Sequence, residues 1–491
     1  MSETKLQETP LAKVRGWSMA YFLEQNKKLF SFLVSIFSGL LIWAFGAPEG
    51  VTTQAWNLFA IFFATILGII LKPLPMGAVA LFSLTTCIMT NTLTFAEAFS
   101  GFSQDVVWLI VMAFFIARGF IITGLGSRVA YFFMKLLGKS TLGLSYGILA
   151  TDFILAPTIP SVTARAGGVI YPILRSVAKA FHSDPQDASS KKMGSFLIKV
   201  AFQGSAITSA MFLTSMAGNP LIAQLAAQSG VTITWGSWAL ASIVPGLCSL
   251  LLIPYFIYKV YPPQVKHTPH AKKFAEDKLK EMGKIKTQEY IMLAAFGILI
   301  TLWIFGASFG IKASVAALIG LSFLIITGVL KWNDILEERG AWDTLFWFSV
   351  LITMATFLNK FGLTTWFGNS VVQGVQGFSP FIGFAILAVL YFYSHYFFAS
   401  NLAHIGAMYA PFLIVAIALG VPGYLAALVL AFFSSLFGGL THYGSGPAPI
   451  LFGSGYVPIG KWWQIGGMVS VVNVLIWMVI GGLWWKVLGL W

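Results

Sequence analysis

The chain has 491 residues, of which 57% are hydrophobic and only 10% are charged. Soluble globular proteins carry about 25% charged residues, so a chain this poor in charge is expected to be solvated mainly by membrane lipid. The formal net charge of +13 does not indicate a nucleic-acid partner, because Lys and Arg concentrate in the polar segments between apolar runs, as the positive-inside rule predicts for cytoplasmic loops. The composition therefore favours an all-α polytopic membrane protein.

Residues 1–28 are expected to form a cytoplasmic N-terminus that leads directly into a spanning helix. Basic and acidic residues are mixed there, and the apolar run that follows has no small-residue cleavage site, which argues against a signal or transit peptide. Apolar runs long enough to cross the hydrocarbon core recur along the chain, and we expect about 11 transmembrane helices from them. Helices are favoured over a barrel because the runs lack the alternating pattern of lipid-facing strands. The runs lie near 29–47, 54–72, 75–91, 105–123, 196–216, 239–258, 289–307, 313–331, 343–359, 380–396, 424–440 and 464–489.

The longest polar segment, 259–288, divides the chain into transmembrane halves at 29–258 and 289–491. Its excess of lysine predicts a cytoplasmic position, on the same side as the N-terminus. Residues 274–285 have the pattern of an amphipathic helix at the membrane surface. A solvated linker without a further role is the alternative.

Each half contains two apolar regions that Gly, Pro and polar residues interrupt. The first interruptions lie at 156–168 and 398–407, and the second at 217–220 and 441–447. When the first pair of interruptions is aligned, three positions carry the same residue. They are Ser at 161 and 400, Ala at 164 and 403, and Gly at 167 and 406. Paired broken segments at corresponding positions indicate a transporter with internal repeats.

A break inside a spanning helix frees backbone N–H groups that lipid cannot satisfy, so it must be buried in protein or face a water-filled cavity. Freed N–H groups and the N-terminus of the following half-helix attract anions. Ionised carboxylates are pure hydrogen-bond acceptors and match such a donor-rich site. The candidate substrate-binding residues are Ser161, Val162, Thr163, Arg165, Gly218, Asn219, Pro220, Ser400, Asn401, Leu402, His404, Thr441, Gly444, Gly446 and Pro447.

Arg165 and His404 occupy equivalent places in the two halves, four residues after the superimposed serines. An ionisable residue deep in a membrane is costly and is a functional candidate by default. We predict that both supply fixed positive charge that compensates the substrate anion. The alternatives are that Arg165 snorkels or pairs with Asp152, and that His404 is a neutral, hydrogen-bonded bundle residue.

The sequence resembles the divalent anion/sodium symporters (DASS), most closely the branch of citrate/succinate antiporters and 2-oxoglutarate/malate translocators. The resemblance covers nearly the whole chain and rests on 101–103 (Gly-Phe-Ser), 123–126 (Thr-Gly-Leu-Gly), 156–168, 398–404 and 453–456 (Gly-Ser-Gly-Tyr). It implies a homodimer of inverted repeats with scaffold and transport domains. The transport domain would carry two re-entrant hairpins, at about 141–176 and 380–416, and slide across the membrane like an elevator.

The two hairpin tips depart from the Ser-Asn-Thr pattern that the resemblance implies for substrate and sodium contacts. Val162 replaces the Asn of the first tip, and Leu402 replaces the Thr of the second. We therefore expect sodium-independent, obligatory exchange of C4–C6 di- or tricarboxylates such as 2-oxoglutarate, succinate, malate or citrate, with Arg165 and His404 in place of a coupling cation. Sodium- or proton-coupled dicarboxylate symport is the alternative.

Two other classes of protein fit less well. A membrane enzyme is disfavoured because His-Glu-x-x-His motifs, clustered carboxylates and Cys/His ligand sets are absent from the sequence. We accordingly expect no catalytic residues, metal or cofactor. The other alternative is a passive anion channel. Saturable counterflow would argue against it, because a pore does not exchange its substrates stoichiometrically. The sequence predicts a multi-pass protein of a plasma membrane, and a bacterial cytoplasmic membrane in particular.

Overall fold

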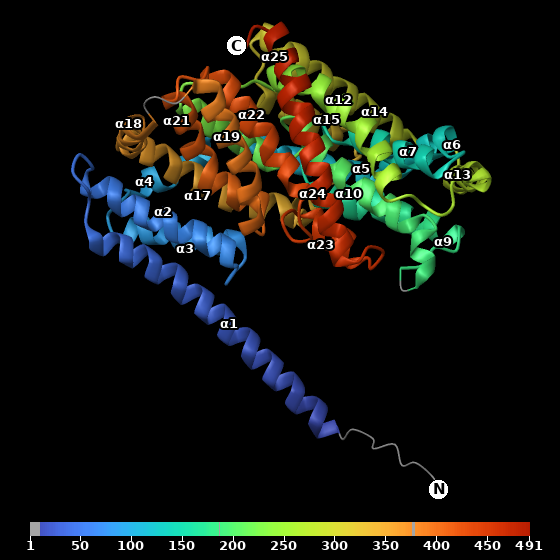
Figure 1. The fold of residues 1–491 in the computed structure, drawn as a ribbon, viewed down its shortest axis with the longest axis horizontal. Coiled ribbons are helices and arrows are strands. Elements are labelled where there is room, and N and C mark those ends of the chain that lie inside the picture. The colour runs from blue at the N-terminus through green and yellow to red at the C-terminus, as the bar shows by residue number, and fades with distance from the viewer. Residues whose placement is uncertain (1–9, 186, 376–378) are drawn as a thin grey trace.

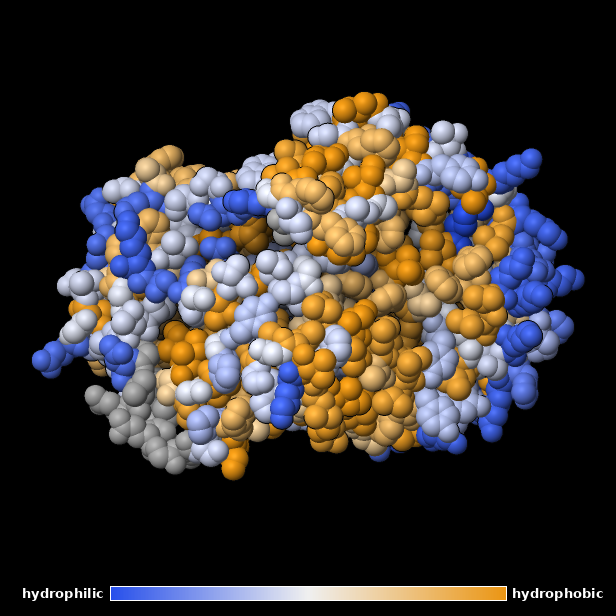
Figure 2. All heavy atoms as spheres, turned by 90° about the horizontal axis from the view of Figure 1, so that it is seen from above, coloured by the Kyte–Doolittle hydropathy of each residue, from blue (hydrophilic) through white to orange (hydrophobic). Residues whose placement is uncertain are grey.

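The computed structural model describes residues 10–185, 187–375 and 379–491, and the regular secondary structure in these ranges is helical apart from one isolated β-bridge. Nine helices within them are long and apolar enough to cross a membrane. Hydrophilic residues gather at two opposite ends of the molecule and a broad hydrophobic region separates them (Figure 2). The predicted fold class, an all-α polytopic membrane protein, is confirmed.

The first half begins with a long helix that extends away from the body of the protein (Figure 1). Every apolar run predicted to span in this half contains a helix. The sequence carried no prediction for α6, which is amphipathic rather than uniformly apolar. The helices are α1 (Pro10–Phe45), α2 (Thr53–Leu71), α3 (Met76–Met89), α4 (Phe95–Ala98), α5 (Asp105–Thr123), α6 (Leu125–Leu137), α7 (Thr141–Leu155), α8 (Val162–Ala164), α9 (Tyr171–Ala180), α10 (Gly194–Met211), α11 (Gly218–Gln228) and α12 (Trp235–Val260).

The second half also has a helix in each predicted spanning run. Its helices are α13 (Pro269–Met282), α14 (Thr287–Phe305), α15 (Ala313–Ile326), α16 (Trp332–Glu337), α17 (Arg339–Lys360), α18 (Leu363–Val375), α19 (Pro380–Tyr393), α20 (Asn401–His404), α21 (Ala410–Ala418), α22 (Gly423–Leu436), α23 (Pro447–Gly453), α24 (Ile459–Leu475) and α25 (Gly482–Val487).

The contacts between helices divide many of them into two groups. In the first group α2, α3 and α17 lie side by side, and α5 packs against α15 and α17. In the second group α10 packs against α7, α12 and α22, and every residue of α10 is buried. Helix α11 lies between the groups, since it contacts α5 and α17 as well as α22.

Both broken regions contain the same irregular helix. Helix α8 continues through a π-helical segment, Arg165–Ile170, into α9, and α20 continues through Ile405–Tyr409 into α21. Pro172 and Pro411 follow these segments at the spacing of the predicted repeat. Proline has no N–H for the carbonyl four residues before it, and its ring clashes there. The helix widens locally as a result, in the manner of a π-bulge.

Gly101 lies at a close crossing in the first group of helices. A Cβ atom at this position would lie 2.1 Å from the carbonyl oxygen of Ser349 on α17. The Gly101 N–H donates to Thr353 Oγ1 at 3.0 Å. Only glycine allows two backbones to approach this closely, which gives a physical reason for the glycine of the 101–103 motif.

The polar linker between the halves is docked on the protein. Helix α13 begins about one turn before the predicted amphipathic segment and packs against α6, with Ala271 and Ala275 buried. Thr268 Oγ1 donates to the Gly138 carbonyl at 2.8 Å, where the chain leaves α6. Figure 1 shows α6 and α13 together at one end of the molecule.

Candidate functional site

A cavity of about 330 Å³ brings the two interrupted regions together. Its walls come from both groups of helices, and serine and threonine hydroxyls are frequent among them. The volume falls at the small end of the usual range for small-molecule sites. The cavity is lined by Met76, Phe114, Pro160, Ser161, Val162, Thr163, Ser205, Ala206, Ser209, Met216, Ala217, Gly340, Asp343, Thr344, Trp347, Ser400, Asn401, Leu402, Ser435, Gly438, Ser445, Gly446 and Pro447.

The first tip begins a helix directly at the cavity. Ser161 is extended and caps this helix, because its Oγ accepts a hydrogen bond from Ala164 N at 3.1 Å. The Ser161 hydroxyl proton remains available to a bound acceptor. Thr163 lies against Gly446 of the second half, where a Cβ atom would come within 2.0 Å of Thr163 Oγ1. The first tip is therefore positioned by direct contact with the second half of the chain.

The second tip is held by an asparagine. Ser400 is extended, and helix α20 begins at Asn401. Asn401 Nδ2 donates to the Ser434 carbonyl at 3.1 Å, which fixes the side chain on the end of α22. Its Oδ1 atom is buried and has no hydrogen-bond partner among the described residues, so it is available to a donor group on a bound molecule.

In the interruptions that follow α10 and α22, only some of the predicted residues face the cavity. Met216 and Ala217 line it, whereas Gly218, Asn219 and Pro220 are buried behind them. Asn219 Nδ2 instead donates to the carbonyls of Ser209 and Phe212, at 2.8 and 2.9 Å, which satisfies backbone groups that the break leaves free.

In the interruption after α22, at 441–447, some of the predicted residues likewise line the cavity and others do not. Gly446 and Pro447 line the cavity, whereas Thr441 and Gly444 do not. Thr441 is buried, and its Oγ1 accepts from Gly444 N at 2.8 Å. These two residues shape the turn that presents Gly446.

The described cavity lining contains no basic side chain, so any attraction for an anion must come from backbone groups. Three helical stretches, 162–180, 401–418 and α11, direct their N-termini at it, and each such end carries roughly half a positive charge. Asp343 is the one charged residue among the described lining residues, and it belongs to the opposite wall. Its Oδ1 accepts from Gly77 N at 3.2 Å. Hydroxyls and helix N-termini together give this cavity a lining with several hydrogen-bond donors.

Arg165 lies behind the cavity wall and is fully buried. Its Nε donates to Asp152 Oδ1 at 2.9 Å, the pairing that the sequence left open as the alternative. Its Nη1 donates to the carbonyls of Ile159 and Ser215, at 2.5 and 2.6 Å. The side chain of a helical residue points back toward the start of its helix, and here that direction leads to α7 and the first break. Arg165 thus joins the first tip to its surroundings, and its charge is matched by Asp152.

His404 is also buried, behind the second tip, and stacks between aromatic rings. Its centroid lies 4.5 Å from that of Phe398 and 4.4 Å from that of Phe437. Its Nδ1 lies 3.1 Å from Nδ1 of His395, and its Nε2 lies 3.1 Å from Ser394 Oγ. Neither His404 nor Arg165 lines the cavity, so neither side chain contacts a molecule bound there.

Sequence reasoning missed two sets of lining residues. Ser205 and Ser209 of α10, with Ser435 of α22, precede the breaks, and closely spaced serines before each break were a readable signal. The opposite wall, which includes Asp343 and Trp347, belongs to ordinary spanning helices without a break, and no local pattern marks it.

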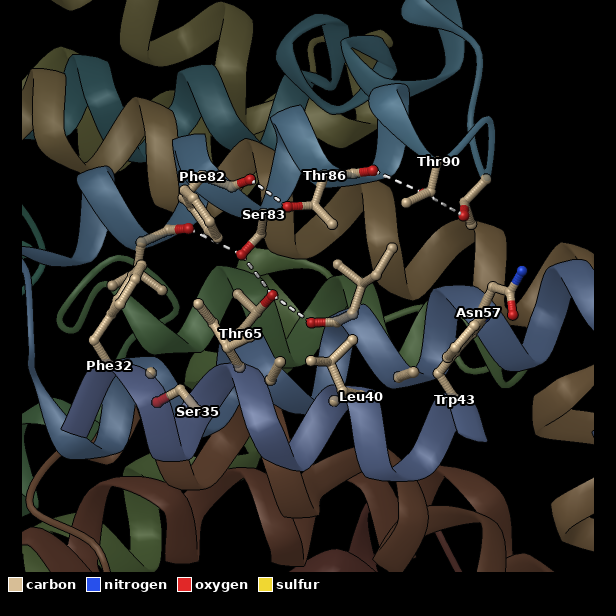
Figure 3. Close-up of a pocket in the computed structure, with 18 of the residues that line it drawn as sticks. Phe32, Ser35, Leu40, Trp43, Asn57, Thr65, Phe82, Ser83, Thr86 and Thr90 are labelled. Atoms are coloured by element: carbon tan, nitrogen blue, oxygen red, sulfur yellow. Dashed lines mark hydrogen bonds between the residues drawn. The ribbon is translucent and has the colours of Figure 1, made fainter. Parts of the chain in front are cut away.

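A larger cavity, about 580 Å³, lies between α1, α2 and α3 (Figure 3). It does not suit an anion, because its lining is mostly apolar and contains no charged residue. Its hydroxyls already donate to their own helices: Thr65 to the Ile61 carbonyl at 2.7 Å and Ser83 to that of Val79 at 2.9 Å. The site of chemical interest is therefore the smaller cavity at the tips.

Multiple spanning helices, paired broken segments and a polar cavity between two helix groups define a polytopic membrane transporter. Residues 26–491 match the family model described as the sodium:sulfate symporter transmembrane region. The chain belongs to this family, which confirms the resemblance seen in the sequence.

Relatives and a solved structure agree with this assignment. The chain is 56% identical over 465 residues, 94% of its length and 97% of the other, to Bacillus subtilis YflS, which is named as a proposed malate transporter. It is 54% identical over 462 residues, 94% of its length and 83% of the other, to chloroplastic dicarboxylate transporter 1 of Arabidopsis thaliana. The crystal structure of the Alcanivorax borkumensis YdaH transporter has the same fold, with a TM-score of 0.54, 12% identity, and coverage of 94% of this chain and 98% of that one.

Proposed function

We propose that this protein exchanges C4–C6 di- or tricarboxylates across a membrane. The observation that carries the proposal is the cavity at which two hairpin tips and three helix N-termini meet. Hydroxyls and backbone N–H groups donate to carboxylate oxygens, and the dipoles at the helix ends favour negative charge. The names of the relatives, a proposed malate transporter and several dicarboxylate transporters, support the same substrate class.

An elevator motion fits the composition of the cavity walls. The hairpin tips form one wall, and α3, α5 and α17 form the other, through Met76, Phe114 and Trp347 among others. A site at the boundary between two packed groups becomes accessible from either side when one group slides along the other. The tips and α10 would move, and α5, α14, α15 and α17 would form the scaffold of a homodimer.

Obligatory exchange gives a role to a fully buried lysine that the sequence did not single out. Lys199 of α10 is fully buried, its Nζ donates to the Trp462 carbonyl at 2.9 Å, and the same atom lies 4.3 Å from the centroid of the Trp462 ring. No carboxylate pairs with it in the part of the chain that the structure describes. Moving an uncompensated buried charge costs several kcal/mol, which slows the motion about a hundredfold or more. Lys199 does not line the cavity, so under this proposal a bound dianion stabilises the protonated lysine from a distance, and the loaded protein moves more readily than the empty one.

His404 is a second buried ionisable side chain near the cavity wall. His395 Nε2 bonds the Gly444 carbonyl, so a neutral His395 must accept from His404 Nδ1. Ser394 gives its one proton to the Tyr391 carbonyl. All the hydrogen bonds that link Gly444, His395, His404 and Ser394 can therefore form together only when His404 also carries a proton on Nε2. The charge-compensating role of His404 remains a prediction, whereas for Arg165 the pair with Asp152 shifts our proposal to a positioning role.

The same hydrogen-bond network around His404 favours a second candidate function, proton-coupled dicarboxylate symport. A neutral His404 requires the Ser394 hydroxyl to turn from Tyr391 toward the ring, so the network accommodates either protonation state at the cost of one bond. Under this alternative, an inward proton gradient drives uptake into empty vesicles, and His404→Gln abolishes the effect of the gradient.

Replacing Lys199 by Met is expected to permit uptake into vesicles that contain no counter-substrate. Met keeps the buried volume but removes the charge that hinders movement of the empty protein. Lys461→Met is the matched control, because Lys461 lies one residue from Trp462 but is exposed. Strict dependence on internal substrate in a folded Lys199→Met protein would show that this charge does not enforce exchange.

The direct test of the proposed function is uptake of labelled succinate into proteoliposomes of the purified protein. Vesicles preloaded with unlabelled 2-oxoglutarate or left empty are compared, each with and without an inward sodium gradient. Exchange predicts uptake only into loaded vesicles and no response to sodium. Sodium-driven uptake into empty vesicles would instead establish the symport alternative.

Homodimer formation and a bacterial cytoplasmic membrane complete the proposal. The relative from Bacillus subtilis supports the bacterial setting. Light scattering of the detergent-solubilised protein measures the mass of the assembly, and a single protomer of 53.5 kDa would contradict the dimer.

A further inference from the structure

A second groove lies far from the substrate cavity, between the amphipathic helix α6 and the linker helix α13. It encloses about 720 Å³ and is lined by basic and apolar residues together. Figure 2 shows hydrophilic residues gathered at the end of the molecule where Figure 1 places these two helices. The groove therefore lies where the hydrophobic surface of the protein meets its polar end.

Two of the four basic residues in the groove have carboxylate partners. Arg128 Nε and Nη2 bond the carboxylate of Glu289, at 2.5 and 3.1 Å. Lys135 pairs with Glu276 at 3.4 Å.

Lys280 and Lys284 also line the groove, and neither has a partner among the described residues. The groove consequently presents two ammonium groups without carboxylate partners among the described residues, one in the last turn of α13 and one just beyond the end of that helix.

The apolar residues of this region face outward. Phe132 of α6 is 54% exposed, its neighbour Leu136 is 60% exposed, and Ile285, which follows α13, is 41% exposed. Large exposed apolar side chains beside lysines on an amphipathic helix are typical of segments that lie in the membrane interface. A soluble anion such as inorganic phosphate would use the lysines but would leave the apolar wall unused.

We propose that this groove binds an anionic phospholipid. The phosphate of the headgroup contacts Lys280 and Lys284, and the acyl chains cover Phe132 and Leu136. Basic pockets beside membrane-spanning helices are a recurrent form of anionic lipid site. Helix α6 joins α5 to the hairpin that begins with α7, so a lipid in the groove is held against the connection between the two helix groups.

The test is lipid binding measured by native mass spectrometry on the purified full-length protein, with phosphatidylglycerol or phosphatidylcholine added. Wild-type protein is expected to retain phosphatidylglycerol in preference to phosphatidylcholine. The variant Lys280→Gln/Lys284→Gln is expected to bind it about thirtyfold more weakly, from about fivefold per lysine near a lipid headgroup. Excess inorganic phosphate is expected not to displace the lipid.

The control is Lys272→Gln/Lys273→Gln, which makes the same charge change at exposed positions of α13 that do not line the groove. It is expected to bind like wild type. Equal retention of the two lipids, equal weakening by both double variants, or displacement by phosphate would overturn the proposal. Because the readout is binding, it does not depend on the transported substrate.

Discussion

Replacing Arg165 by Lys is expected to abolish transport even though the positive charge is kept. The guanidinium bonds Asp152 and two backbone carbonyls, of Ile159 and Ser215, at once. A lysine ammonium lacks the planar fork that reaches all three. Each buried carbonyl left without a donor costs about 1–3 kcal/mol, and the first tip loses its attachment. Uptake into loaded proteoliposomes measures this effect.

The role of the Asp152 pair is separated by two further variants. Arg165→Met leaves Asp152 buried without a partner and is expected to destabilise the protein by about 3–5 kcal/mol. The double variant Asp152→Asn/Arg165→Met should recover part of that stability in thermal unfolding, but not transport. If Arg165→Lys transports like wild type, positive charge alone is sufficient, and Arg165 acts as the fixed charge first predicted from the sequence.

The second large effect is expected from Gly446→Ala. The added Cβ would lie 2.0 Å from Thr163 Oγ1, so either the Thr163 side chain rotates out of its contact or the first tip moves away from the second half. A displacement of about 1 Å at a preorganised site costs roughly a hundredfold in rate, and we expect a loss of that size in exchange.

Gly453→Ala is the control: Gly446 is the N-cap residue of α23 and Gly453 is its last residue, and a Cβ at Gly453 meets nothing within 4 Å. Size-exclusion chromatography checks the fold, and exchange by Gly446→Ala at the rate of Gly453→Ala would show that the tip contact is dispensable.

The sequence predicted the fold class and the two tips, because breaks and apolar runs are local patterns. Residues 161–163 and 400–402 all line the cavity, as do Gly446 and Pro447. Which side chains of a helix face a cavity depends on the packing of distant segments, so the sequence did not reveal that Arg165 and His404 lie behind the wall.

Other parts of the site could not be predicted from the sequence. Lys199 falls inside an apparently ordinary apolar run, and its lack of a carboxylate partner among the described residues is visible only in three dimensions. Asp343 and Trp347 face the tips because two groups of helices pack together, and a contact between distant segments leaves no periodic signal in either.

The π-helical segments before Pro172 and Pro411 bear on the history of the chain. Such a segment holds one more residue per turn than its surroundings, so deleting a single residue would turn everything beyond it by about 100° around the helix axis. An insertion of this kind is hard to acquire twice at the same place. If the two halves are the internal repeats predicted from the sequence, a segment inherited from one half-length ancestor accounts for both occurrences without two separate insertions.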